Sequence, residues 1–106
     1  MKEKDAQKQI LQYLALKQIW SIRHNTGAAV IKSGNTQRFV RFGTPGLADI
    51  VAFTKGGQVI WIEVKSAKGK QSELQREFQK QAEKHGHVYI LAKSVEDLYP
   101  LFGGGL

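Results

Sequence analysis

The sequence predicts one α/β domain in which helices pack against several strands. Apolar residues recur every three or four positions in residues 6–17 and again in residues 74–82, which is the spacing of amphipathic helices. Residues 59–64 and 88–92 are apolar runs rich in β-branched and aromatic side chains, which favours buried strands. A chain of 106 residues has room for one such core, so we treat residues 1–106 as a single domain.

The N-terminal half is predicted to hold a helix followed by short strands. The helix begins at Glu3 or Asp5, because acids in a first turn suit the helix dipole, and it ends near residue 17. Trp20 and Trp61 are expected to lie in the core. The remaining segments of this half are, in order, a half-buried strand at 20–24, a turn at 25–27, a strand at 28–31, a polar loop at 32–37 and a strand at 38–42.

The C-terminal half is predicted to continue with a hairpin, a helix, a strand and a short helix. Gly56 and Gly57 can adopt positive φ, so they favour a hairpin between strands on either side of residues 54–57. Ser72 begins the second helix and Gly86 ends it. After the strand at 88–92 the sequence predicts a last helix, which begins at residues 94–98 and stops near Pro100.

The charge distribution favours binding to a polyanion. The formal net charge is +7. Between residues 6 and 72 the acids are Asp49 and Glu63, and the bases are Lys8, Lys17, Arg23, Lys32, Arg38, Arg41, Lys55, Lys65, Lys68 and Lys70. This pattern is typical of nucleic-acid binding, although a basic surface can also serve solubility alone.

Other function classes are excluded or disfavoured by composition. The chain has no cysteine, which excludes disulfides, thiolate zinc sites and a cysteine nucleophile. No apolar run approaches the roughly 18 residues that a membrane span needs. Residues 1–5 are charged and lead into an amphipathic pattern, unlike the apolar core of a signal peptide.

Two acids and a lysine are predicted to meet at one end of the hairpin. Glu63 and Lys65 are two residues apart at the end of a buried strand, so they point to the same face. Antiparallel pairing then brings Asp49 beside them, because it opens the preceding strand. Such a group suits a divalent metal ion with a cationic neighbour. The alternatives are that Asp49 caps a turn and that Glu63 and Lys65 form a surface ion pair.

The same residues belong to a longer pattern that resembles a known family. Residues 43–50 (GTPGLADI), 62–65 (IEVK) and 69–75 (GKQSELQ) resemble the VRR-NUC branch of the PD-(D/E)xK nucleases, in the standalone form of viruses and bacteria. The match covers nearly the whole chain. Glu-x-Lys alone is common, but its combination with the preceding Asp and the following Ser-x-x-Gln is specific. One departure is that Ala48, and not a proline, precedes Asp49; Pro45 lies four residues earlier.

The resemblance implies a fold, a cofactor and an activity. It implies a restriction-endonuclease-like core with the order αβββαβ and a mixed sheet flanked by helices. It implies Mg²⁺ or Mn²⁺ held by Asp49, Glu63 and the main-chain carbonyl of Val64, with Lys65 orienting or helping to deprotonate the attacking water. The expected protein is a structure-specific endodeoxyribonuclease that acts on branched DNA such as Holliday junctions. It is expected to be a homodimer in the cytoplasm, bacterial or of a host cell.

Several roles stay open at the level of sequence. Glu3 matches a first-helix glutamate that related nucleases place near the metal, or it simply suits the helix dipole. Gln75 lies at the edge of the active site, or it completes a capping box with Ser72. The candidate DNA contacts, each also explicable as a solvated side chain, are Arg38, Arg41, Lys68, Lys70 and Arg23. The alternative functions are an inactive DNA-binding module and a nuclease of the flap, single-strand or restriction type.

Overall fold

The elements follow the predicted order, with one long hairpin inserted among the strands. The structure, a computed structural model, describes residues 2–24 and 27–105, with the backbone alone for residues 27–30 and 40–42. No helix in this described part is long and apolar enough to cross a membrane. The elements are α1 (Glu3–Leu16), β1 (Trp20–Arg23), β2 (Gly27–Ser33), β3 (Thr36–Phe42), β4 (Ile50–Phe53), β5 (Val59–Val64), α2 (Glu73–Lys84), β6 (Val88–Ala92), a 3₁₀ turn η1 (Val95–Leu98) and α3 (Tyr99–Phe102).

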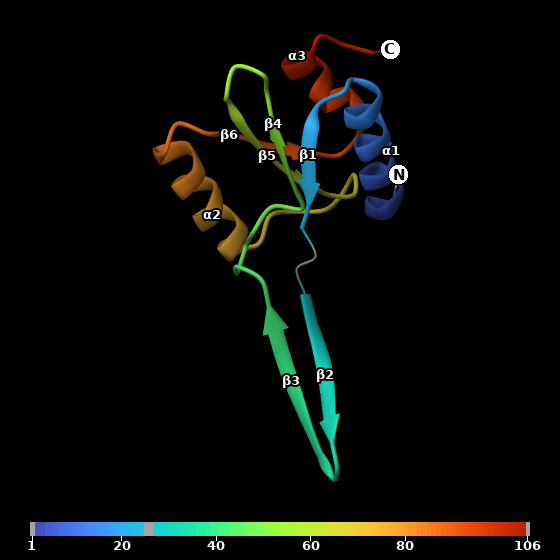
Figure 1. Ribbon diagram of the computed structural model, residues 1–106, viewed down its shortest axis with the longest axis vertical. Helices are drawn as coiled ribbons and strands as arrows, with labels where there is room; N and C mark the ends of the chain where they lie inside the picture. Colours follow the sequence, from blue (N-terminus) through green and yellow to red (C-terminus); the bar gives the residue numbers. More distant parts are fainter. Residues whose placement is uncertain (1, 25–26, 106) are drawn as a thin grey trace.

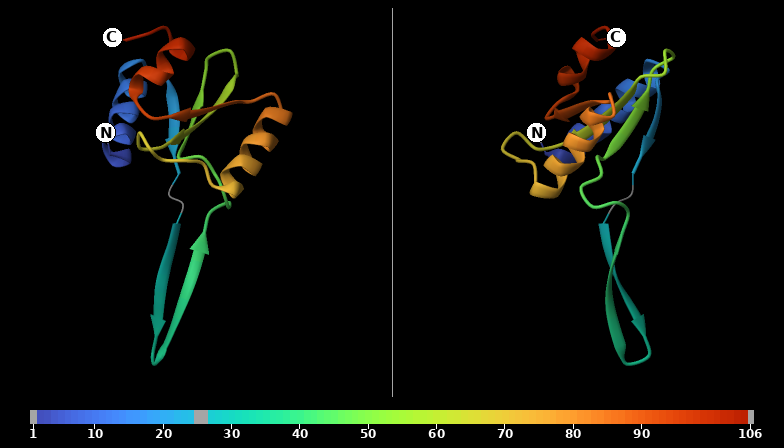
Figure 2. Two further views of the ribbon diagram at one scale, coloured as in Figure 1. Left: turned by 180° about the vertical axis from the view of Figure 1, so that it is seen from behind. Right: turned by 90° about the vertical axis from the view of Figure 1, so that its left-hand side faces the viewer.

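The body of the molecule is a mixed four-stranded sheet with helices on both faces (Figures 1 and 2). The strand order is β1-β4-β5-β6, in which β5 and β6 are parallel and the other pairs are antiparallel. A parallel pair needs a crossover, and α2 provides it. Along the chain the elements of this body come in the order α1, β1, β4, β5, α2 and β6, followed by η1 and α3.

The main core lies between α1 and one face of the sheet. Ala6, Ile10 and Leu14 recur every four residues and are fully buried against Ile50 and Ile62. The predicted apolar stripe of the first helix is therefore confirmed. On the opposite face, α2 covers a smaller cluster formed by Ala48, Ala82 and Tyr89, with Trp61 and Phe78 packed against it.

Strands β2 and β3 form a separate antiparallel hairpin that extends away from the body (Figure 1), in a molecule that measures 54 × 30 × 27 Å. Pairing runs from Gly27 opposite Phe42 to Ser33 opposite Thr36, so most of the predicted loop at 32–37 is strand. The physical reason is the tight turn at Gly34, whose φ of 60° suits a two-residue hairpin loop. The turn predicted at 25–27 lies mostly outside the described residues.

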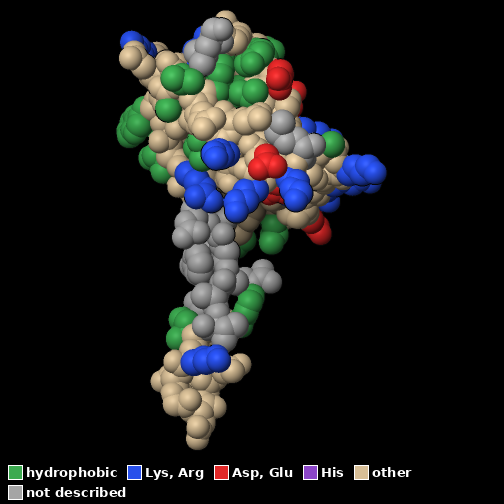
Figure 3. All heavy atoms as spheres, turned by 90° about the vertical axis from the view of Figure 1, so that its right-hand side faces the viewer, with side chains coloured by type: hydrophobic (Ala, Val, Ile, Leu, Met, Phe, Trp, Pro, Cys, Tyr) green, Lys and Arg blue, Asp and Glu red, His purple; other side chains and the backbone are tan. Residues whose placement is uncertain are grey.

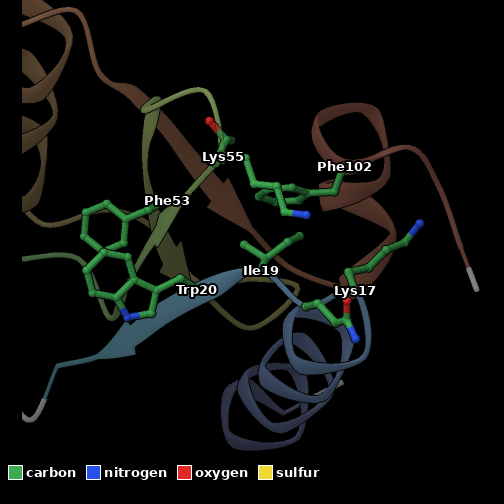
Figure 4. Close-up of a pocket in the computed structure, with 8 residues that line it drawn as sticks. Lys17, Ile19, Trp20, Phe53, Lys55 and Phe102 are labelled. Carbon is green, nitrogen blue, oxygen red and sulfur yellow. The ribbon is translucent and has the colours of Figure 1, made fainter.

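Trp20 does not lie in the core, contrary to the sequence-based expectation. Its side chain is 67% exposed, and β1 is not half-buried, because β1 is an edge strand that α2 does not reach. The indole instead packs on Phe53, with 4.5 Å between ring centroids. The two rings border a cavity of about 480 Å³ that Ile19 and Phe102 also line (Figure 4).

The C-terminal segment continues past the predicted stop. Pro100 does not end the last helix; it lies in the first turn of α3. A first turn tolerates proline, because its N–H groups have no partner within the helix. The segment packs back on α1, where the Tyr13 hydroxyl donates to the carbonyl of Gly104 over 2.6 Å.

Candidate functional site

Asp49 directly precedes β4 and Glu63 lies in the neighbouring strand β5, at the same end of the sheet. Ile50 pairs with Ile62, so the antiparallel register continues to Asp49 opposite Glu63. Directly opposed residues in an antiparallel pair share a face, which here is the face that α2 covers. The position of Asp49 is fixed further by the backbone N–H of Val64, which donates to its Oδ2 over 2.8 Å. The hairpin thus brings the two acids together, as the sequence predicts.

Glu63 is a buried acid with one unpaired oxygen. The residue is 2% exposed. The Nζ atom of Lys65 lies 3.6 Å from Oε2, and the amide of Gln75 donates to the same oxygen over 3.0 Å. Among the described residues, Oε1 has no hydrogen-bond partner. A buried acceptor without a partner costs free energy, so this oxygen needs a proton or a cation.

The pKa of Glu63 reflects this environment. Burial, and then the charge of Asp49, raise it from 4.5 to about 8, against the opposing effect of Lys65. Without a further cation, Glu63 therefore carries a proton at neutral pH. An acid whose pKa is raised toward neutral pH by burial and by a neighbouring carboxylate is typical of a functional site.

Gln75 makes a contact that fits each of the two positions that the sequence left open. Its Oε1 accepts from the backbone N–H of Ser72 over 2.9 Å, which completes the capping box of α2. Its Nε2 donates to Oε2 of Glu63 over 3.0 Å. The two ends of one amide thus connect the start of the helix to the buried acid.

Gly46 allows the loop before Asp49 to pack against the start of α2. Its φ is +76°, and a Cβ at this position would overlap the backbone carbonyl group of Leu74. Only glycine fits such a close backbone approach without strain. This contact holds the segment that carries Asp49 against the helical turn that carries Gln75.

His24 is a site residue that the sequence analysis did not identify. Its backbone N–H donates to the carbonyl of Asp49 over 2.7 Å, and its ring Nδ1 lies 2.9 Å from the carbonyl oxygen of Ala48. The imidazole stacks on Trp61, with 5.9 Å between ring centroids. The signal that could have found it is the pairing of β1 with β4, which places His24 next to Asp49.

Tyr89 is a second residue that the sequence analysis missed. Burial raises the pKa of its phenol to about 12; the hydrogen bond from Gln71 lowers it, and the nearby charges of Glu63 and Asp49 raise it. Gln71 Nε2 donates to the hydroxyl over 3.2 Å. The phenol of Tyr89 therefore stays neutral near the acid pair. Its position follows from the parallel pairing of Trp61 with Tyr89, which the local sequence does not reveal.

Glu3 lies apart from the two acids. It is exposed in the first turn of α1, where it suits the helix dipole. Within residues 2–24 and 27–105, no three Asp, Glu or His side chains lie close enough together to hold one metal ion. Glu3 therefore does not join Asp49 and Glu63 in an acidic cluster.

The candidate DNA contacts are not one set beside the acids, contrary to expectation. Lys68 and Lys70 are exposed in the loop between β5 and α2, which leaves the site after Lys65. Arg38 lies on the projecting hairpin, opposite Ile31. Arg23 lies on β1, and the side chain of Arg41 lies outside the described part of the structure. Of these candidates, only Lys68 and Lys70 lie in the loop that directly follows β5, the strand that carries Glu63.

The residues present suit a divalent cation. Mg²⁺ prefers oxygen ligands and needs only one or two carboxylates, because it keeps several waters. Asp49 and the unpaired Oε1 of Glu63 provide carboxyl oxygens. The carbonyl of Val64 is a further candidate, since the N–H and C=O of one strand residue point the same way and this N–H points to Asp49.

Comparisons with protein-family models, curated proteins and solved structures found no match to this chain. The resemblance to VRR-NUC nucleases therefore stays a prediction that rests on the motifs quoted above.

Proposed function

We propose that this chain is a metal-dependent endodeoxyribonuclease with a restriction-endonuclease-like core. The observation that carries the proposal is the buried Glu63 beside Asp49, because the unpaired Oε1 and the raised pKa of Glu63 call for a cation. The pair lies at one end of the sheet in a chain of net charge +7. A cation site on a basic protein suits hydrolysis of a polyanion backbone.

Each side chain of the site has a defined task in this reaction. Mg²⁺ or Mn²⁺, held by Asp49, Glu63 and the carbonyl of Val64, would neutralise the two acids and stabilise negative charge on the phosphate. Lys65 keeps its ammonium group 3.6 Å from Glu63 with a side chain that is 15% exposed, so it can donate to the attacking water or to a phosphate oxygen. Gln75 holds Glu63 in place through its amide.

The proposal includes branched DNA as substrate and a homodimer as the active form. Each chain carries one pair of acids, whereas symmetric cleavage of a four-way junction needs two sites. The two phosphodiester bonds would then be cut by two copies related by a twofold axis.

The test is cleavage of a labelled four-way junction, with duplex, flap and single strand of matched sequence alongside. Each substrate is incubated with Mg²⁺, Mn²⁺ or EDTA. The variant is Glu63→Gln, which keeps the shape of the side chain. Its matched control is Glu77→Gln, which removes an exposed acid that also pairs with a lysine, Lys80, over 3.3 Å.

We expect paired nicks on the junction. They should disappear in EDTA and in the Glu63→Gln variant, but should persist in the Glu77→Gln variant. Cuts confined to flap or single strand would keep the metal chemistry and reject the junction. Tight binding without cuts in either metal would reject the nuclease in favour of a binding module. Light scattering of the purified protein measures whether it is a dimer.

A further inference from the structure

A basic groove lies between α1 and β1, on the side of the sheet opposite α2. Its cavity of about 530 Å³ is lined by Lys4 and Lys8 of α1 and by Arg23 of β1. The amides of Gln7 and Gln12 and the carboxyl of Asp5 complete its polar lining. Figure 3 views the molecule from the side of α1 and shows Lys and Arg side chains gathered directly above the projecting hairpin.

Arg23, which lines the groove, lies at the end of β1 that is next to Asp49. Arg23 pairs with Ile50, which packs in the core formed with α1, so the Arg23 side chain lies on the α1 face. The next residue, His24, donates its N–H to the carbonyl of Asp49 over 2.7 Å. The side chain of Arg23 and the two acids therefore lie at the same end of the sheet but on opposite faces. Lys4 and Lys8 lie one helical turn apart, about 6 Å along the helix axis.

The cations of the groove are not neutralised by the protein itself. In the described ranges 2–24 and 27–105, the ion pairs involve Lys65 and Lys80 alone. Lys4, Lys8 and Arg23 thus have no acidic partner within ion-pair distance, although Asp5 lines the same groove. Three cations against one acid leave the groove with a net positive charge. Donor-rich amides beside them suit phosphate and sugar oxygens.

We propose that this groove binds the phosphate backbone of a DNA strand that passes the end of the sheet where Asp49 and Glu63 lie. The identity of the polyanion as DNA rests on the proposed function, whereas the position of the contact rests on the groove itself. Arg23 was already a candidate DNA contact from the sequence, and the groove adds Lys4 and Lys8 of α1 to it.

The test is the salt dependence of DNA binding, measured in EDTA so that no cleavage is needed. The groove variant is Lys4→Gln, Lys8→Gln and Arg23→Gln combined. The control has the same loss of charge at three exposed lysines away from the groove, Lys55→Gln, Lys80→Gln and Lys84→Gln. Fluorescence anisotropy of a short labelled duplex gives the binding constant at several salt concentrations, and thermal melting checks that each variant is folded.

Each phosphate contact contributes about 0.9 to the slope of log K against log salt on duplex DNA, so the groove variant should lose about 2–3 units of slope. The control should lose less than one unit. An equal change in both variants, or none in the groove variant, would overturn the inference. Binding that depends on the groove in a protein that cuts no substrate would support the groove and reject the nuclease.

Discussion

Replacing Glu63 by Gln should stabilise the protein, by an amount that grows with pH. The folded-state pKa of Glu63 is about 8, against 4.5 for a free glutamate. Between these values the folded chain keeps a proton that the unfolded chain releases, so the free energy of unfolding of the wild type falls as pH rises through this window. Glutamine does not titrate, so the variant lacks this loss and can still accept from Gln75.

The magnitude follows from the size of the pKa shift. A shift from 4.5 to about 8 corresponds to about 5 kcal/mol at most, at about 1.4 kcal/mol for each pKa unit. Lys65 loses its charged partner in the variant, and the site can relax, so we expect a gain of about 2–4 kcal/mol above pH 8. This is a large share of the 5–15 kcal/mol that typically stabilise a domain.

The assay is urea unfolding in EDTA at several pH values between 5 and 9, on wild type, Glu63→Gln and the control Glu77→Gln. The difference between Glu63→Gln and wild type should be near zero at pH 5 and should rise up to pH 8. Adding Mg²⁺ should stabilise the wild type and leave the variant unchanged, because the ion binds the folded carboxylate. Curves that stay parallel across the whole pH range would refute the assignment of Glu63 as a strained buried acid.

Four further predictions concern neighbouring residues. Lys65→Ala should bind DNA like wild type in a binding assay but lose most cleavage; full cleavage would remove Lys65 from the mechanism. Gln75→Ala should lower cleavage, while Ser72→Ala, which loses the same cap, should keep it, and each should cost about 1 kcal/mol in urea unfolding. Equal activities of these two would limit Gln75 to capping. Gly46→Ala should lose at least about 1–2 kcal/mol from its positive φ alone, plus the cost of displacing α2, as measured by thermal melting and by cleavage. Glu3→Gln should cleave at the wild-type rate, since Glu3 lies apart from the acid pair; a loss of activity would contradict this placement.

Features that depend on short stretches of sequence could be predicted. The alternation that places Glu63 and Lys65 on one face, and the glycines between β4 and β5, act over a few residues. They were enough to bring Asp49 beside Glu63. The stripe of Ala6, Ile10 and Leu14 likewise follows from helical spacing alone.

Features that depend on which elements become neighbours could not be predicted. Trp20 has the composition of a core residue, but its exposure is decided by the edge position of β1 and by the reach of α2. Glu3 lies apart from the two acids because of the path of α1. Arg38 lies apart from them because β2 and β3 form their own sheet. His24 and Tyr89 join the site only through strand pairings between segments far apart in the sequence.

The contact between Gly46 and α2 also limits how this site can change by mutation. A side chain at position 46 would meet the carbonyl group of Leu74 and the backbone nitrogen of Gln75, which every residue type shares. A second substitution at position 74 or 75 therefore cannot make room for it. In a genetic screen, loss of function at Gly46 should yield true revertants but no second-site suppressors in the first turn of the helix.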